Sequence, residues 1–120
     1  MTTAERAATP LVPSLPARRP DAPGQFAFAD RRRVERILEQ SGWTAVDIRP
    51  IDVPCTLAAK DLTLYLTRLG PVGRALERMD EKRRAQVIET IRTAFEPYVH
   101  GVEVRFTAAC WMIGAHAPSA

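Results

Sequence analysis

The sequence predicts a mixed α/β fold in which three helices stand between two strands along the chain. Apolar residues recur at helical spacing over residues 31–41 and again between residues 62 and 95, whereas they alternate at every second position after Thr44 and after Gly101. A period near 3.6 residues is typical of a helix with one buried stripe, and a period of two is typical of a half-buried strand. The predicted order is therefore helix, strand, three helices, strand.

Residues 1–25 are expected to form a disordered tail or linker before this fold. The segment is rich in proline, alanine and arginine, a composition that favours extended, solvated backbone and offers little to bury. Its prolines also interrupt any continuous apolar stretch, so the segment lacks the pattern of a secretory signal. We expect a cytoplasmic protein with its ordered part at residues 26–117 and a short tail at residues 118–120.

The first helix is predicted at residues 31–41. Asp30 is placed to act as its N-cap, because a carboxylate there accepts hydrogen bonds from amides of the first turn. Ser41 and Gly42 supply the left-handed stop that helix C-termini favour. The expected buried stripe consists of Val34, Ile37 and Leu38.

The first strand is predicted from Thr44 to Val53, with a bulge where the apolar phase shifts after Pro50. Proline donates no backbone hydrogen bond, so Pro50 and Pro54 indicate a strand at the edge of a sheet. Two short helices are predicted next, over residues 62–69 and 72–79, with a break at Gly70-Pro71. Asp80 is expected to cap a third helix that Pro97 ends.

The last strand is predicted from Val102 to Ile113. Its first half alternates between apolar and polar residues, and its second half, from Ala108, is wholly apolar. A strand of this kind is expected to be half-covered at first and buried on both faces later.

Composition and charge exclude several classes of partner. The net charge of +3 is spread over the chain, whereas nucleic-acid-binding domains gather Lys and Arg on one face. No apolar run approaches the roughly 20 residues of a membrane helix. The densest basic cluster, Arg31 to Arg36, is interpreted as the solvated face of the first helix. We therefore expect neither nucleic acid nor membrane as a partner.

The chain offers few groups for catalysis or metal binding. Cys55 and Cys110 lie far apart without a nearby ligand at metal spacing, and we expect both to be buried, reduced thiols. His100 and His116 are isolated, and no Ser or Cys stands at a nucleophile-elbow spacing. The glycines at positions 70 and 73 join two helices, whereas a phosphate-cradling loop follows a strand. No catalytic or metal-binding residue is assigned.

Six segments share a recognisable order and spacing: Pro23 to Asp30, Val34 to Leu38, Ser41 to Val46, Asp52 to Pro54, Leu69 to Leu76 and Val102 to Ile113. Together they resemble the late part of class I S-adenosylmethionine-dependent methyltransferases of the UbiE-like, type 11 kind. In that family they correspond to an entry loop, a helix, a Gly-aromatic turn, the sixth strand and its exit, a helical insert over the substrate pocket, and the final strand. The resemblance covers roughly residues 20–117, and it departs at Arg31, where such sequences often have Pro.

The resemblance implies a partial Rossmann-like methyltransferase fold: a C-terminal antiparallel strand pair with a helical insert and flanking helices. The family's cofactor, S-adenosylmethionine, is held by a Gly-rich loop and an acidic residue after the first two strands. Neither motif occurs here, so no cofactor is expected for this chain alone. The resemblance assigns substrate-binding positions to Phe28, Leu66, Leu69, Gly70 and Pro71. The alternative is that these residues pack the insert against the sheet.

The resemblance therefore predicts the substrate-side portion of a methyltransferase that lacks its cofactor-binding half and is inactive alone. The protein partner of the chain would be the cofactor-binding half on another chain, or a second copy of this chain that pairs with the exposed strand. Its substrate would be a small-molecule methyl acceptor. The rival hypothesis is a stand-alone α/β binding or dimerisation module, with Arg31 to Arg36 meeting an acidic partner.

Overall fold

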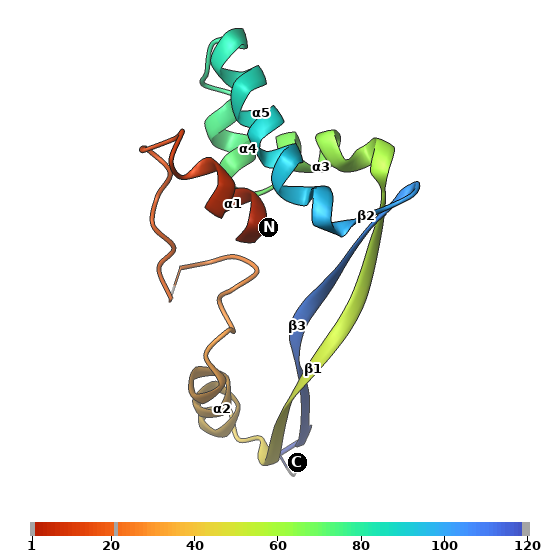
Figure 1. Cartoon of the computed structure of the whole chain (residues 1–120). Helices are drawn as coiled ribbons and strands as arrows, with labels where there is room; N and C mark the ends of the chain where they lie inside the picture. The colour runs from red at the N-terminus through yellow and green to blue at the C-terminus, as the bar shows by residue number, and fades with distance from the viewer. Residues whose placement is uncertain (1, 21, 119–120) are drawn as a thin grey trace. The chain divides into compact units, whose positions relative to one another are not determined.

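The computed structural model describes residues 2–20 and 22–118 (Figure 1). It is a mixed α/β structure with a three-stranded antiparallel sheet, so the predicted class of fold is confirmed. Its elements are α1 (Thr2–Ala8), α2 (Arg31–Gln40), β1 (Thr44–Ala58), the 3-10 turn η1 (Ala59–Asp61), α3 (Leu62–Arg68), α4 (Gly70–Leu76), α5 (Glu81–Phe95), the 3-10 turn η2 (Glu96–Tyr98), β2 (Val99–His100) and β3 (Glu103–His116).

Contacts along the chain separate two compact units. The first, here called the helical unit, comprises Met1–Pro16 and Pro54–Phe106. The second, the ribbon unit, comprises Ala17–Val53 and Thr107–Ala120. The long strands β1 and β3 each contribute one end to the helical unit and the rest to the ribbon unit.

The sheet has the strand order β1-β3-β2. β2 is two residues long and pairs antiparallel with the start of β3, Val99 facing Val104 and His100 facing Glu103. At the other edge of the sheet, β1 ends where the amide of Ala59 donates to the carbonyl of Val102 over 2.8 Å. β1 is thus an edge strand, as its two prolines predicted.

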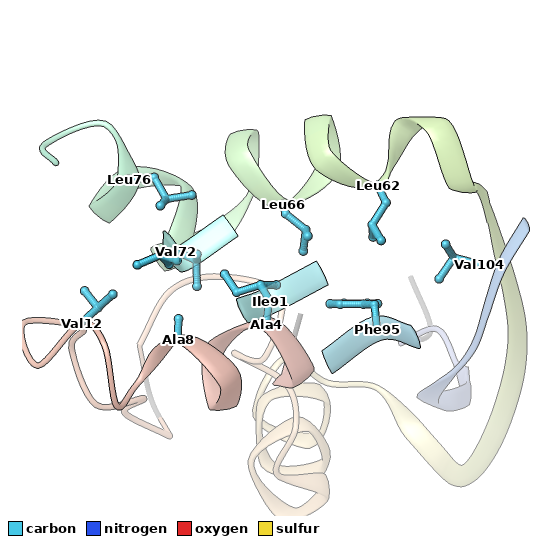
Figure 2. Close-up of a cluster of buried hydrophobic side chains, with 11 residues drawn as sticks. Ala4, Ala8, Val12, Leu62, Leu66, Val72, Leu76, Ile91, Phe95 and Val104 are labelled. Carbon is cyan, nitrogen blue, oxygen red and sulfur yellow. The ribbon is translucent and has the colours of Figure 1, made fainter. Parts of the chain in front are cut away.

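The core of the helical unit lies among α1, α3, α4 and α5 (Figure 2). Helix α1 packs on α5 and α4, and α3 packs on α4 and α5. Figure 2 shows Ile91 of α5 between Leu66 of α3 and Ala4 of α1. The buried residues of this core are Ala4, Ala8, Val12, Leu62, Leu66, Val72, Leu76, Val87, Ile91, Phe95 and Val104.

The N-terminal segment differs from the predicted disordered tail. Residues Thr2–Ala8 form a helix, and the side chains of Ala4, Ala8 and Val12 are buried. A helix this short is marginal by itself in water, so its packing on α4 and α5 must hold it. The small side chains of Ala4 and Ala8 let α1 approach α5 closely.

The two predicted aspartate N-caps and the predicted glycine stop are present in the structure. The Asp30 carboxylate accepts from the amide of Arg32, and the Asp80 carboxylate accepts from the amide of Arg83, each over 2.9 Å. Gly42, which follows the C-cap residue Ser41 of α2, has a φ of +87°. The helical stripe of α2 is less covered than predicted, because Val34 is buried but Ile37 is 41% exposed.

The strands differ from the predictions in three places. β1 continues through Pro54 to Ala58, so Asp52 to Pro54 is not the exit from the strand. β2 was not predicted, because two residues are too few to show a period. The apolar half of β3 is not buried on both faces, since Met112 is 49% and Ile113 43% exposed.

In the ribbon unit, two side-chain contacts hold the entry loop, Pro23 to Asp30, before α2. The Trp111 indole N–H donates to the carbonyl of Ala29 over 3.2 Å. The guanidinium of Arg18 lies 3.6 Å from the centre of the Phe26 ring, close enough for a cation–π contact. Asp30 then starts α2 directly after this loop.

Candidate functional site

Three of the five predicted substrate-binding residues line one hollow in the helical unit. Leu66, Leu69 and Pro71 surround it together with Ala4, Glu5, Tyr65 and Val72. Its volume of about 10 Å³ is close to the minimum that a single water molecule needs. Leu66 itself is only 2% exposed and belongs to the core. The structure thus brings these three predicted residues together around one small hollow.

The other two predicted residues behave differently. Phe28 belongs to the ribbon unit, in the loop that Trp111 and Arg18 contact, and its side chain is 59% exposed. Gly70 has a φ of +73°, a backbone conformation that glycine adopts without strain, and it separates α3 from α4. The structure thus groups the residues of the insert and leaves Phe28 in the other unit.

The glycine pair of the insert has a structural explanation. A Cβ atom built on Gly73 lies 3.1 Å from the carbonyl oxygen of Thr67 and 3.1 Å from the carbonyl carbon of Arg68. Glycine at position 73 therefore allows the backbone of α4 to approach the end of α3. A loop that holds S-adenosylmethionine follows a strand and opens a helix, whereas this pair opens α4 but follows the helix α3, so it does not match such a loop.

Two larger hollows occur in the helical unit. The first, of about 530 Å³, lies between the end of β1 and the β2–β3 turn and is lined by residues 56–60 and 101–103. The second, of about 470 Å³, lies between Pro10–Pro13 and the start of α5, where the Arg83 guanidinium donates to the carbonyl of Leu11 over 3.2 Å. Lys60 and Glu103 are the charged residues that line the first hollow, and Asp80, Lys82 and Arg83 are those that line the second.

Possible metal ligands are dispersed over the part of the chain that the structure describes. Within residues 2–20 and 22–118, no group of three or more His, Cys, Asp or Glu is placed to hold a metal ion. The ion pair between Arg49 and Asp47 (2.8 Å) joins residues two apart on one exposed strand, as does that between Arg105 and Glu103 (3.1 Å). Pairs of this kind contribute little to stability.

The cysteines and arginines only partly match the predictions. Cys110 is exposed and Cys55 half-buried, so the prediction of two buried thiols is wrong. Of the basic cluster, Arg31, Arg32 and Arg36 are exposed, as a solvated face requires. Arg33 is the exception, since its Nη1 is buried without a hydrogen-bond partner in the part of the chain that the structure describes.

Strand β3 has a neighbouring strand along one edge and only a short one at the start of its other edge. It has β1 along one edge, but on its other edge β2 pairs only with Glu103 and Val104. Among the described residues, no third strand follows β2 along that edge. The sequence pattern indicated β3 and its apolar composition, but it did not show that β2 closes the first two positions of this edge.

Comparison of the chain with family models, curated proteins and solved structures found no match. None of the described helices is both long and apolar enough to cross a membrane. The function of the chain is therefore inferred from the pattern and arrangement of its own residues.

Proposed function

We propose that this chain is the C-terminal, substrate-side portion of a class I S-adenosylmethionine-dependent methyltransferase, and that it is inactive alone. The proposal rests on the resemblance of residues 20–117 to that family and on one structural observation, the incomplete sheet around β3. In the complete fold of the family, the final strand lies inside the sheet, between the sixth strand and the fifth. The order β1-β3-β2, with β3 open from Arg105 onwards, suits a sheet that lacks the fifth strand.

The burial of β3 supports the same proposal. From Phe106 to Ala115 the strand carries no charged residue, yet Cys110, Met112 and Ile113 are exposed. Central strands of α/β sheets have this composition because helices cover both of their faces. A further segment that added a strand and its helices would cover these side chains.

The cofactor-binding half would supply the chemistry in this proposal. That half would bind S-adenosylmethionine, and this chain would contribute the loop around Phe28 and the insert formed by α3 and α4. No residue of the chain is assigned to the cofactor, since the glycines at positions 70 and 73 are explained by the junction of two helices. The identity of the acceptor depends on the details of the loops.

The test begins with the DNA immediately upstream of the coding sequence. We expect a compatible frame that encodes a strand followed by Asp/Glu-x-Gly-x-Gly. Joined to this chain or co-expressed with it, the product should bind S-adenosylmethionine in calorimetric titration, whereas this chain alone should not. Micromolar binding needs about −8 kcal/mol, which a chain without the cofactor loop should not reach. Micromolar binding by the chain alone, or an upstream region without the motif, would refute the proposal.

The second candidate is a stand-alone α/β binding or dimerisation module without catalytic activity. The observation that favours it is the exposed apolar surface of the ribbon unit, at Phe28, Ile37, Met112 and Ile113. Exposed apolar side chains that adjoin one another often mark a site of protein association. The same upstream search separates the two candidates, because a module of this kind requires no cofactor half.

A further inference from the structure

The open edge of β3 has a defined hydrogen-bonding pattern. His100 and Glu103 face each other across the two-residue turn Gly101-Val102, so they form the closing pair of a hairpin. The backbone groups of a strand point alternately to its two edges. Val102 directs its carbonyl towards Ala59 at the β1 side. Odd-numbered residues from Arg105 to Ala115 therefore direct their N–H and C=O groups to the edge that β2 leaves open.

The two outer edges of the sheet differ in their protection. β1 carries Pro50 and Pro54 together with the charged residues Asp47, Arg49 and Asp52, all of which discourage the addition of another strand. The open part of β3 from Phe106 to Ala115 has neither charge nor proline. Strand addition is thus favoured at β3 and opposed at β1.

The sequence of β3 is complementary to itself around Cys110. When two copies of a strand pair antiparallel about a twofold axis perpendicular to the sheet, each residue faces one equally far on the other side of the centre. With the centre at Cys110, Ala109 faces Trp111 of the second copy and Ala108 faces Met112. Thr107 then faces Ile113, and Phe106 faces Gly114. Each larger side chain meets a smaller one, the pattern that fills space between facing positions.

We propose that two copies of this chain form a dimer by pairing their β3 strands antiparallel about a twofold axis at Cys110. The pairing joins odd-numbered residues through their free backbone groups and turns the sheets of two chains into one. It also brings the exposed Met112 and Ile113 against the second copy. A two-stranded ribbon is at best marginally stable in water, whereas a sheet of four strands can be stable by itself.

The inference goes beyond the proposed function, because it concerns the chain by itself. In the complete methyltransferase a strand of the cofactor half would occupy the same edge of β3. The dimer is therefore the state of this chain when that half is not bound to it. The dimer is tested on this chain alone. If no dimer forms, the methyltransferase proposal and the search upstream of the gene are unaffected.

The native Cys110 serves as a reporter of the proposed register. Cys110 has an even number, so it occupies a non-hydrogen-bonded pair, in which the Cα atoms of facing residues are about 4.5 Å apart. A disulfide requires about 4.4–6.8 Å. Mild oxidation should therefore link two chains through Cys110. The Cys55→Ser variant should link equally well, and Cys110→Ser should not link but should remain a dimer in size-exclusion chromatography with light scattering.

Backbone and side-chain variants test the edge directly. Ala109→Pro removes an N–H from the open edge and spares the groups that face β1, so we expect a monomer with an unchanged far-UV circular dichroism spectrum. Met112→Lys adds a charge to the paired strands and should weaken the dimer about tenfold or more, equivalent to roughly 1.4 kcal/mol. The matched control is Leu64→Lys, on α3 of the helical unit, where the side chain is already 58% exposed.

Three results would overturn the proposal. The first is a wild-type chain that stays monomeric at high micromolar concentration in reducing buffer. The second is oxidation that links two chains through Cys55 in the Cys110→Ser variant as readily as in the wild type. The third is a folded Ala109→Pro variant that dimerises as strongly as the wild type.

Discussion

The packing of the helical unit is tested most directly at Ile91. Its side chain is fully buried, and it lies in the core that α1, α3, α4 and α5 share (Figure 2). The proposed perturbation is Ile91→Ala. This change removes three carbon atoms and leaves the polar groups of the helix as they are.

The expected loss of stability follows from burial. At about 0.8 kcal/mol per methylene, the lost transfer free energy is roughly 2.4 kcal/mol. The cavity left behind adds to this value, so we expect a loss of about 3–4 kcal/mol, within the range measured for such truncations. For a domain of this size the melting temperature should fall by roughly 15–25 °C.

The assay is urea unfolding followed by far-UV circular dichroism, with Leu64→Ala as the control. Leu64 is on α3 and 58% exposed, so its truncation should cost less than about 1 kcal/mol. Equal losses at Ile91 and Leu64 would contradict the packing of α1, α3 and α4 around α5. So would a loss at Ile91 below about 1 kcal/mol.

Three further predictions concern local structure. Asp80→Ala removes the cap of α5 and should lower the free energy of unfolding by about 1 kcal/mol in urea titration, whereas no change would show that the cap is dispensable. Gly70→Ala forces a positive φ on a residue with a Cβ and should cost about 1–2 kcal/mol in the same assay; a more stable variant would contradict this. Trp111→Phe keeps a ring but loses the bond to the carbonyl of Ala29, so amide exchange in the entry loop should accelerate, and unchanged exchange would show that the bond does not hold the loop.

The sequence was most informative where a local interaction decides the structure. Asp30 and Asp80 cap the helices that follow them because a carboxylate at that position meets free amides wherever the chain then turns. Pro50 and Pro54 indicated an edge strand because a missing N–H has the same consequence in any sheet. These signals need no knowledge of the rest of the fold.

The failures occurred where distant contacts decide. The helix at Thr2–Ala8 depends on its packing against α4 and α5, which no property of those seven residues reveals. The exposure of Cys110 depends on what covers β3 rather than on the apolar sequence around it. The substrate-binding residues came from a resemblance and stay a prediction, and three of them line the small hollow beside Leu66.

The division into two units places the aromatic chromophores unevenly. Trp43 and Trp111 both belong to the ribbon unit, while Tyr65 and Tyr98 both belong to the helical unit. Tryptophan emission therefore reports on the ribbon unit, whereas most of the helical signal comes from α1, α3, α4 and α5. Unfolding curves from the two signals coincide if the units melt as one cooperative block and separate if each melts alone. The chain thus carries its own pair of site-specific probes of cooperativity, without any label.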